Sequence, residues 1–244
     1  MKAIRSLFRP LLLAAAFAVA AAGLSANTAI EPVPRGGLPA KMHEDFLAIA
    51  KQGDVDVLFL GDSITDFWRN RGKAVWDKTF APMHAANFGI SADRTQHVLW
   101  RMDHGELDGI KPKVVVLMIG TNNCGLERDN KTPRNSTPEV IEGVTAVVKE
   151  LREKLPQSKI LLLAIFPRAA SPDDPIRAQI KEVNAAISRL DDGKFVRYLD
   201  IGPKFLQPDG TLTKEIMPDL LHPSERGYQI WADAIREPLA EMMR

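Results

Sequence analysis

The stretch Val55-Asp56-Val57-Leu58-Phe59-Leu60-Gly61-Asp62-Ser63-Ile64-Thr65 decides the fold of this chain. An apolar, β-branched run of this length, stopped by Gly-Asp-Ser, is typical of a buried strand that ends at a serine. In open α/β sheets, ligands bind at the carboxyl ends of the strands, so Ser63 is well placed for chemistry. A serine at this point also commonly caps the helix that follows, and for Ser63 taken alone this alternative stays open.

The rest of the chain repeats one unit, an apolar run of strand length followed by a segment whose apolar residues have helical spacing. Five predicted strands cover residues 55–60, 81–89, 113–120, 159–165 and 195–201. Five predicted helices cover residues 41–51, 95–102, 137–155, 174–190 and 224–242, and Thr137 is expected to cap the third. This unbroken alternation predicts one α/β domain, a three-layer α/β/α sandwich with a parallel, flavodoxin-like five-stranded sheet.

The composition is that of an ordinary globular protein. Hydrophobic residues make up 45% and charged residues 26% of the 244 residues, which favours a packed core over disorder. Acidic and basic residues are mixed along the whole chain, and the formal net charge is +1. No basic field for nucleic acid is present, so no nucleic-acid partner is expected. Apart from His222, the histidines lack the paired spacing of metal ligands, so no metal or other cofactor is expected.

The amino terminus differs in character from the rest of the chain. Three positive charges precede an apolar run over residues 11–22, and small residues follow it. This order is the pattern of a secretory signal peptide, and the run is too short to span a bilayer comfortably, so a retained membrane anchor is the weaker alternative. We predict a signal peptide over residues 1–29 and a mature domain over residues 30–244. The mature protein is expected to be secreted or periplasmic, in a bacterium, without stable membrane insertion.

Cys124 is the single cysteine of the chain, so no internal disulfide can form and stability must come from the core. A lone cysteine beside a strand end can be a thiol nucleophile. Packing in the core is the favoured interpretation of Cys124, because a small apolar side chain at that position is the more common case.

A second stretch, Asp219-Leu220-Leu221-His222-Pro223, changes the weight given to Ser63. A serine, an acid and a histidine in this chain order can form a nucleophile, an orienting group and a base. Gly89 and Asn122 follow two further predicted strands, whose ends a parallel sheet brings close to Ser63. Taken alone, each residue has an ordinary explanation as a turn glycine, a loop asparagine, a turn aspartate or a histidine before a helix. Their joint occurrence at predicted loops favours a shared site.

Four short blocks carry a family resemblance. They are Gly61-Asp62-Ser63-Ile64-Thr65, Asn87-Phe88-Gly89, Gly120-Thr121-Asn122-Asn123 and Asp219-Leu220-Leu221-His222. These blocks resemble those of the SGNH hydrolases, also called GDSL esterases. Residues 95–101 and 221–228 further resemble the catalytic subunits of the intracellular platelet-activating-factor acetylhydrolases. The resemblance runs from Val55 to the carboxyl end, with two departures: the export signal, and Ile64 where the family name has leucine.

The resemblance implies a role for each residue of the expected site. Ser63 would be the nucleophile, and His222 the base that takes its proton. Asp219, one helical turn before His222, would orient the imidazole and stabilise its cationic form. The oxyanion hole would combine the backbone N–H groups of Ser63 and Gly89 with the side-chain amide of Asn122. Asp62 is expected to hold the loop after the strand rather than to act as a second acid. The tryptophans are expected in the core rather than stacked on a sugar.

The resemblance and the export signal together imply an exported serine esterase. It would hydrolyse short-chain acyl esters, acetyl esters above all, of a carbohydrate or a lipid-like alcohol through an acyl-serine intermediate. Polar loops over residues 124–136 and 167–174 favour a polar ligand. The alternatives are a lysophospholipase or thioesterase-type acyl hydrolase, a peptidase with the same triad, and a non-catalytic glycan-binding module on the same fold. Because the acetylhydrolase subunits form dimers, the resemblance also implies a homodimer.

Overall fold

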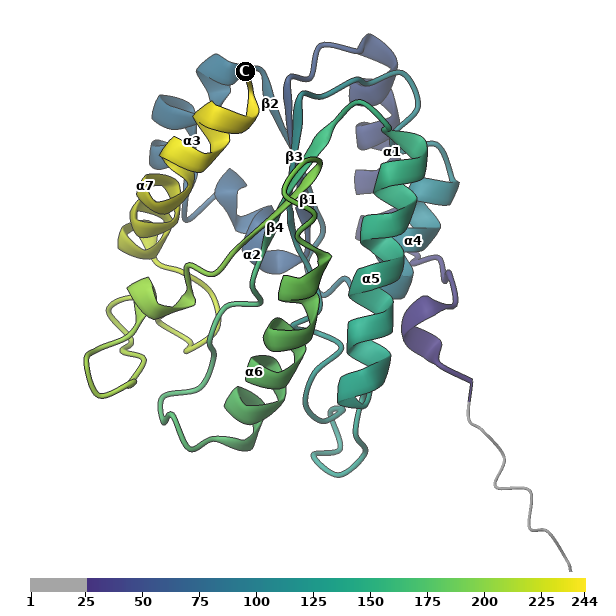
Figure 1. Cartoon of the computed structure of the whole chain (residues 1–244). Coiled ribbons are helices and arrows are strands. Elements are labelled where there is room, and N and C mark those ends of the chain that lie inside the picture. The colour runs from purple at the N-terminus through teal and green to yellow at the C-terminus, as the bar shows by residue number, and fades with distance from the viewer. Residues whose placement is uncertain (1–25) are drawn as a thin grey trace, which may run out of the picture.

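The computed structural model describes residues 26–244 as three layers built around one sheet (Figure 1). The five strands are β1 (Val57–Gly61), β2 (Ala85–Gly89), β3 (Val114–Met118), β4 (Lys159–Leu163) and β5 (Val196–Leu199). All neighbouring strands are parallel, and their order is β2-β1-β3-β4-β5, which is the flavodoxin-like order. The prediction of a three-layer α/β fold with a parallel five-stranded sheet is confirmed.

Helices cover both faces of this sheet (Figure 1). The helices are α1 (Leu38–Gln52), α2 (Ser63–Asp66), α3 (Lys73–Thr79), α4 (Thr95–Asp103), α5 (Thr137–Lys154), α6 (Pro175–Ile187) and α7 (Glu225–Met242). The apolar sides of α1, α4, α5 and α6 form one core with the sheet. Those of α3 and α7 form a second core on the opposite face. The order β2-β1-β3 places β1 in the interior of the sheet, with its carboxyl end between the ends of two other strands.

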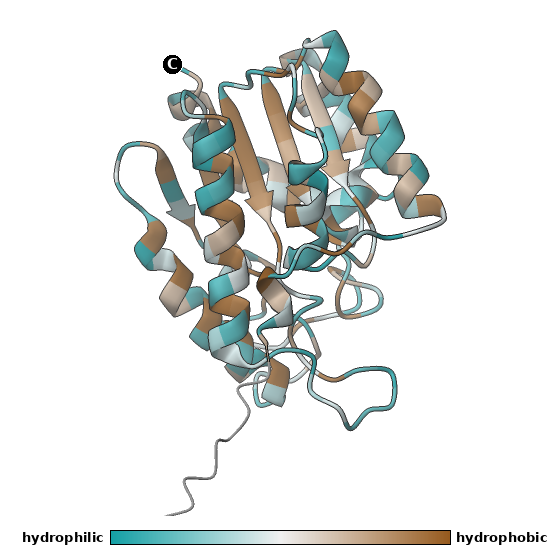
Figure 2. Ribbon diagram, turned by 90° about the vertical axis from the view of Figure 1, so that its right-hand side faces the viewer, coloured by the Kyte–Doolittle hydropathy of each residue, from teal (hydrophilic) through white to brown (hydrophobic). Residues whose placement is uncertain are grey.

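The side chains of β1 explain why this strand has a continuous apolar sequence. Successive residues of a strand point to opposite faces of the sheet. Leu58 and Leu60 therefore pack in the core of α1, α4, α5 and α6, whereas Val57 and Phe59 pack in the core of α3 and α7. Figure 2 shows the sheet strands as mainly hydrophobic ribbons and a long hydrophilic loop beyond their carboxyl ends. Burial on both faces removes the polar alternation that a half-exposed strand would show.

Aromatic side chains fill the core beneath α3 and α7. The rings within 6.3 Å of Phe59, centroid to centroid, are Trp68, Trp76, Phe80 and Trp231. Their tilted and edge-to-face arrangements are those that aromatic pairs prefer. Three of the four tryptophans are therefore packing residues, as predicted, and the fourth, Trp100, lies against the rings of His43 and His104.

Two boundaries differ from the predictions. The strand predicted over residues 81–89 pairs with β1 only from Ala85, because residues 81–83 form a 3-10 turn and His84 has a left-handed backbone with φ of 49°. Helix α5 is capped by Ser136 rather than Thr137. The backbone N–H of Ser136 donates to Glu139 Oε2 at 2.7 Å, and this pair forms a capping box. The segment over residues 63–80, for which no element was predicted, forms α2, a 3-10 turn and α3.

The described chain begins with a short segment that packs on the domain. Ala29 lies in the 3-10 turn η1 (Thr28–Ile30) and is fully buried. Its carbonyl accepts a hydrogen bond of 2.6 Å from Thr95 Oγ1 on α4. Residues 1–25, which carry most of the predicted signal peptide, lie outside the described residues. Across residues 26–244, no helix combines the length and the apolar character needed to cross a bilayer.

Candidate active site

Ser63 lies where β1 ends and the chain turns into α2. Asp62 caps this helix, because its Oδ1 accepts the backbone N–H of Ile64 at 3.0 Å; Ser63 is the first helical residue and does not serve as the cap. Gly61 permits the turn, since a Cβ at this position would collide with the carbonyl oxygen of Met118 on the neighbouring strand. The Ser63 hydroxyl is thus held at the carboxyl end of an interior strand, where ligands bind in this type of fold.

The imidazole of His222 lies between Ser63 and Asp219. His222 Nε2 is 2.8 Å from Ser63 Oγ, and His222 Nδ1 is 2.8 Å from Asp219 Oδ2. With the proton on Nδ1, this nitrogen donates to Asp219, and Nε2 accepts the hydrogen bond of the Ser63 hydroxyl. Folding therefore brings together the three side chains expected to form the triad, although Ser63 and His222 are 159 residues apart in the chain.

Asp219 is held by a turn and not by the helical turn that was expected. Its Oδ1 accepts the backbone N–H of His222 at 2.7 Å and that of Leu221 at 3.2 Å. Leu220, the residue after Asp219, has a left-handed backbone with φ of 59°. Partial burial disfavours the carboxylate, but these bonds and the one from the imidazole outweigh it and lower the pKa of Asp219 to about 2. Asp219 is therefore ionised at neutral pH and faces the imidazole as an anion.

Two residues beside the triad were missed by the sequence analysis. The ring of Phe67 lies 4.8 Å from that of His222, centroid to centroid. Arg71 Nη1 lies 3.5 Å from Asp219 Oδ2, and its guanidinium stands over the Phe67 ring at 5.2 Å. Both residues follow α2 in the segment for which no element was predicted, so no periodic pattern pointed to them. They place an aromatic face and a positive charge against the His222–Asp219 pair.

The three groups expected in the oxyanion hole lie at the carboxyl ends of β2, β1 and β3. The backbone N–H of Ser63 belongs to the first turn of α2, where a helix leaves its donors unpaired. The N–H of Gly89 donates to Asn87 Oδ1 at 2.9 Å, within its own loop. The amide of Asn122 donates to the carbonyl of Asp93 at 3.0 Å and retains a second hydrogen. The amide of Gly89 is thus already occupied, whereas Ser63 and Asn122 have donor capacity to offer.

A buried ionic network fixes the residue that holds Asn122. The fully buried carboxylate of Asp93 accepts from Arg101 Nε at 3.0 Å and from Arg35 Nη1 at 2.7 Å. Burial raises the pKa of Asp93, and both guanidinium groups act against this rise. Asn123 adds a second anchor to the same loop, because its Oδ1 accepts the backbone N–H of Thr95 at 3.0 Å. The loop after β3 is therefore tied to α4 and to the amino-terminal segment.

Neither of the other two reactive side chains near the site is arranged as a nucleophile or a second acid. Burial raises the pKa of Asp62 to about 7, and its bond to Ile64 gives it the structural role that was predicted. Burial also raises the pKa of the Cys124 thiol to about 12, so this cysteine is a neutral packing residue, as predicted. Within residues 26–244, no three His, Cys, Asp or Glu side chains are grouped as metal ligands would be.

A cleft of about 970 Å³ opens beside the acid of the triad. Asp219 and Leu220 line it on one side, and the loop over residues 125–137 and the amino-terminal end of α6 line the others. Arg168 borders the same space, and its Nη1 donates to the carbonyl of Thr121 at 3.2 Å. The volume is in the range of sites that bind small molecules, and the polar side chains of Asn130 and Arg168 on its otherwise largely apolar walls can bind hydrogen-bonding groups of a ligand.

The sequence of the chain matches known proteins over most of its length. The model of the GDSL-like lipase/acylhydrolase family matches residues 59–230. The human platelet-activating factor acetylhydrolase IB subunit alpha1 is 34% identical over 220 residues, which are 90% of each chain. The rat alpha2 subunit is 37% identical over 202 residues, which are 82% of this chain and 81% of that protein.

Solved structures share the fold at lower sequence identity. A putative platelet activating factor from Streptococcus pneumonia superimposes with a TM-score of 0.66 at 22% identity, covering 82% of this chain and 92% of that one. The acetyl xylan esterase AlAXEase superimposes with a TM-score of 0.61 at 20% identity, covering 75% and 98%. An acetylxylan esterase from Geobacillus stearothermophilus gives a TM-score of 0.59 at 20% identity, covering 74% and 92%. At these identities the likeness concerns the fold alone.

Proposed function

Because the chain belongs to the GDSL-like lipase/acylhydrolase family, we propose that it is a serine esterase acting on short acyl esters, acetyl esters above all. The observation that carries the proposal is the continuous hydrogen-bonded chain from Ser63 Oγ through His222 to Asp219. This is the arrangement in which a base can take the proton of a nucleophile while an acid holds the base in position.

In the proposed reaction, Ser63 Oγ attacks the carbonyl carbon of the ester while His222 Nε2 takes the hydroxyl proton. The C–O bond to the alcohol then breaks, and the imidazolium returns the proton to the leaving alcohol. A water molecule next attacks the acyl-serine, His222 takes its proton, and the acid leaves as Ser63 recovers its hydrogen. Asp219, ionised at neutral pH, stabilises the imidazolium that appears in both halves of the reaction.

The negative charge on the carbonyl oxygen would be bound by the N–H of Ser63 and the amide of Asn122. Asn122 is held by Asp93 and Asn123 by Thr95, so this donor is oriented before substrate arrives. Gly89 can join them only if its N–H exchanges Asn87 for the substrate oxygen. Asparagine is a neutral donor, so its contribution does not titrate.

The preference for acetyl rests on the relatives, and the preference for a polar alcohol on the cleft. The names of the curated relatives and of two structural neighbours share the removal of an acetyl group. Beside Asp219, the cleft is lined by Arg168, Asn130 and Gln179, whose side chains can bind hydroxyl groups. We therefore place the acetylated alcohol, a carbohydrate in preference to a lipid-like alcohol, in this cleft.

The proposal is tested by hydrolysis of p-nitrophenyl acetate and p-nitrophenyl octanoate by the purified protein. We expect turnover of the acetate to exceed that of the octanoate, and loss of turnover in Ser63→Ala. Asn122→Ala is expected to lower kcat by about 10²–10³-fold, the usual effect of removing one oxyanion donor. A fluorophosphonate should label wild type but not Ser63→Ala. Equal rates in wild type and Ser63→Ala would end the proposal, and a preference for octanoate would favour a thioesterase or lysophospholipase.

We also propose export, on the charge and hydropathy pattern of the first 29 residues. The sequence pattern places the boundary after Ala29. Because the side chain of Asn27 donates to Glu142 at 2.6 Å and Ala29 is buried, we propose an earlier cut, before Asn27. The mass of the protein recovered from the periplasm or the medium tests this. A mass that corresponds to a chain beginning after Ala29, or an uncleaved chain in the cytoplasm, would contradict this proposal. The implied homodimer is tested by light scattering of the mature protein.

A further inference from the structure

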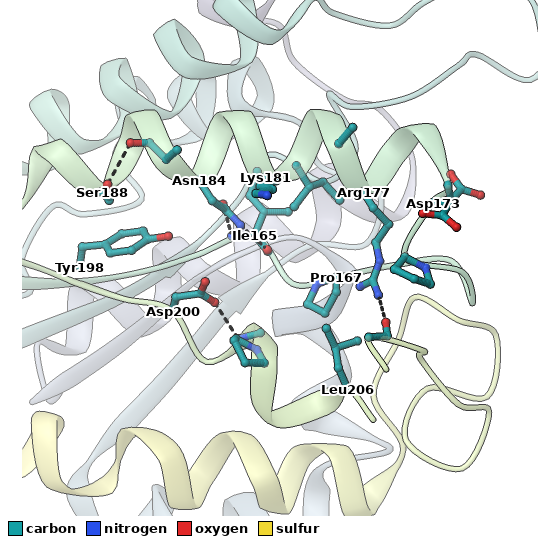
Figure 3. Close-up of a pocket in the computed structure, with 18 residues that line it drawn as sticks. Ile165, Pro167, Asp173, Arg177, Lys181, Asn184, Ser188, Tyr198, Asp200 and Leu206 are labelled. Atoms are coloured by element: carbon teal, nitrogen blue, oxygen red, sulfur yellow. Dashed lines mark hydrogen bonds between the residues drawn. The ribbon is translucent and has the colours of Figure 1, made fainter. Parts of the chain in front are cut away.

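A second groove of about 830 Å³ lies between α6 and the segment that follows β5 (Figure 3). None of the triad residues lines it. Figure 3 shows Tyr198 and Asp200 reaching from the end of β5 into the space beside α6, while Arg177 reaches from the helix toward the opposite wall. The volume falls within the range of sites that bind small molecules, and nothing in the proposed reaction uses this groove.

The groove is elongated, because its lining follows α6 from one end to the other. Helical lining residues run from Asp174, the N-cap of α6, to Ser188, its C-cap. At a rise of 1.5 Å per residue this distance is about 20 Å. Such a shape suits an extended ligand better than a compact one.

The walls combine apolar surface with positively and negatively charged side chains that can form hydrogen bonds. The apolar part comes from Ile165, Pro167, Pro172, Pro203 and Leu206, and the charged part from Asp173, Asp174, Arg177, Lys181 and Asp200. Positive and negative side chains face the same space, so neither an anion nor a cation is selected. An alkyl chain would desolvate these charges without replacing their hydrogen bonds. A neutral sugar chain offers both apolar C–H faces and hydroxyl groups.

Part of the polar lining is already paired within the protein, and part remains for a ligand. Asn184 donates to and accepts from the backbone of Ile165, each at 2.9 Å, so one hydrogen and one lone pair of its amide are already engaged. Among residues 26–244, the Tyr198 hydroxyl and the Lys181 ammonium have no hydrogen-bond partner, and Asp200 uses only Oδ1, toward Gly202. Burial and, after it, the charge of Asp200 raise the pKa of Tyr198, so its phenol stays a neutral donor and acceptor.

The groove begins where the cleft beside the triad ends. Asp174 lines both spaces, and the two lie against opposite sides of α6. Gln179 borders the cleft, whereas Arg177 and Lys181 border the groove. A chain that enters the cleft near Asp219 therefore reaches the groove by crossing the amino-terminal end of a single helix.

We propose that this groove is a distal subsite that binds neutral sugar units of an oligosaccharide whose acetyl group lies at Ser63; the proposal rests on the esterase function above. The triad and cleft then act on the ester, and the groove along α6 selects longer glycans over short ones. Binding in the groove would lower KM for long substrates and would leave KM for small substrates unchanged.

The test compares an acetylated β-1,4-linked hexasaccharide with the matching acetylated monosaccharide and with p-nitrophenyl acetate. Ala185→Trp fills the groove from an exposed position of α6, and Arg189→Trp places the same ring just past the helix end, outside the groove. We expect Ala185→Trp to raise KM for the hexasaccharide about tenfold, equivalent to 1.4 kcal/mol, with the small substrates unchanged. Arg189→Trp should match wild type on all three, and Tyr198→Phe with Lys181→Ala should repeat the effect more weakly.

Direct binding separates failure of this proposal from failure of the esterase function. The unacetylated hexasaccharide, titrated into Ser63→Ala and followed by NMR of backbone amides, should perturb residues of α6 and β5, and Ala185→Trp should abolish these shifts. If these shifts occur but no acetyl ester is hydrolysed, the result supports the sugar-binding subsite and contradicts the esterase function. The subsite is overturned if the hexasaccharide leaves α6 unperturbed. It is also overturned if Ala185→Trp impairs long acyl esters instead, which would assign the groove to an alkyl chain.

Discussion

Arg71 is the residue whose position near the triad has the most direct chemical consequence. Its guanidinium lies 3.5 Å from Asp219 Oδ2 and 3.5 Å from the carbonyl of His222. A positive charge at this distance attracts the Asp219 carboxylate and so helps to hold the acid beside the imidazole. Because the pKa of Asp219 is lowered to about 2, the acid itself stays ionised throughout the working range.

We predict that Arg71→Ala lowers kcat/KM, because Asp219 loses a positive charge that helps to hold its carboxylate beside the imidazole. The side chain of Arg71 is 39% exposed, so solvent screens the charge and the loss should be less than about tenfold. Arg71→Lys, which keeps the charge, is the matched control and should retain most of the wild-type activity. An unchanged kcat/KM in Arg71→Ala would contradict this role.

At the scale of one element, the amino-terminal strap, defined as residues 27–35, acts on the site through the loops that it holds. Arg35 Nη1 donates to the carbonyl of Ser91 and to Asp93 Oδ1, each at 2.7 Å. The carbonyl of Asp93 in turn receives the amide of Asn122. Two hydrogen bonds, through Asp93, therefore connect Arg35 of the strap to Asn122, the proposed oxyanion donor.

We predict that Arg35→Ala lowers both stability and turnover. Asp93 is fully buried and keeps Arg101 as its partner, so the loss of one charged hydrogen bond should reduce the free energy of unfolding by about 1–3 kcal/mol. Asn122 would then be less well oriented, and kcat should fall more than KM rises. Urea denaturation and steady-state kinetics measure the two effects. The exposed Arg189→Ala is the control, and an unchanged kcat in a destabilised Arg35→Ala would restrict the strap to a structural role.

At the scale of the whole molecule, stability depends on the two cores, since one cysteine cannot form an internal disulfide. Cys124 lies in the core that α1, α4, α5 and α6 form with the sheet, and it is fully buried. Its pKa of about 12 keeps the thiol neutral as long as the core is closed. The reactivity of this thiol therefore reports the opening of the fold.

We predict that Cys124 resists a thiol reagent in native buffer at about pH 8 and reacts fully in denaturant. The labelling rate should follow the population of the open form, so Arg35→Ala, which is expected to be less stable, should be labelled faster than wild type. Mass spectrometry of the labelled protein measures this. Rapid and complete labelling of the native wild type would show that the core is open at Cys124, against the burial described.

Local patterns in the sequence determined the layers of this protein. The run over residues 55–61 is apolar at every position from Val57 to Leu60, because both faces of β1 are covered, and the helices alternate with such runs. These signals come from neighbouring residues, so they survive in the linear chain. The capping box of Ser136 and Glu139 is likewise a local pattern, although the sequence analysis predicted the next residue, Thr137, as the cap.

Only the tertiary structure decided which side chains meet. The amide of Gly89 bonds to Asn87, Arg71 reaches Asp219, and the groove along α6 is closed by residues that follow β5. Each of these contacts depends on the angle at which one element packs on another, or on the path of an irregular turn. No periodicity encodes those quantities, because they result from packing between segments that are distant in the chain.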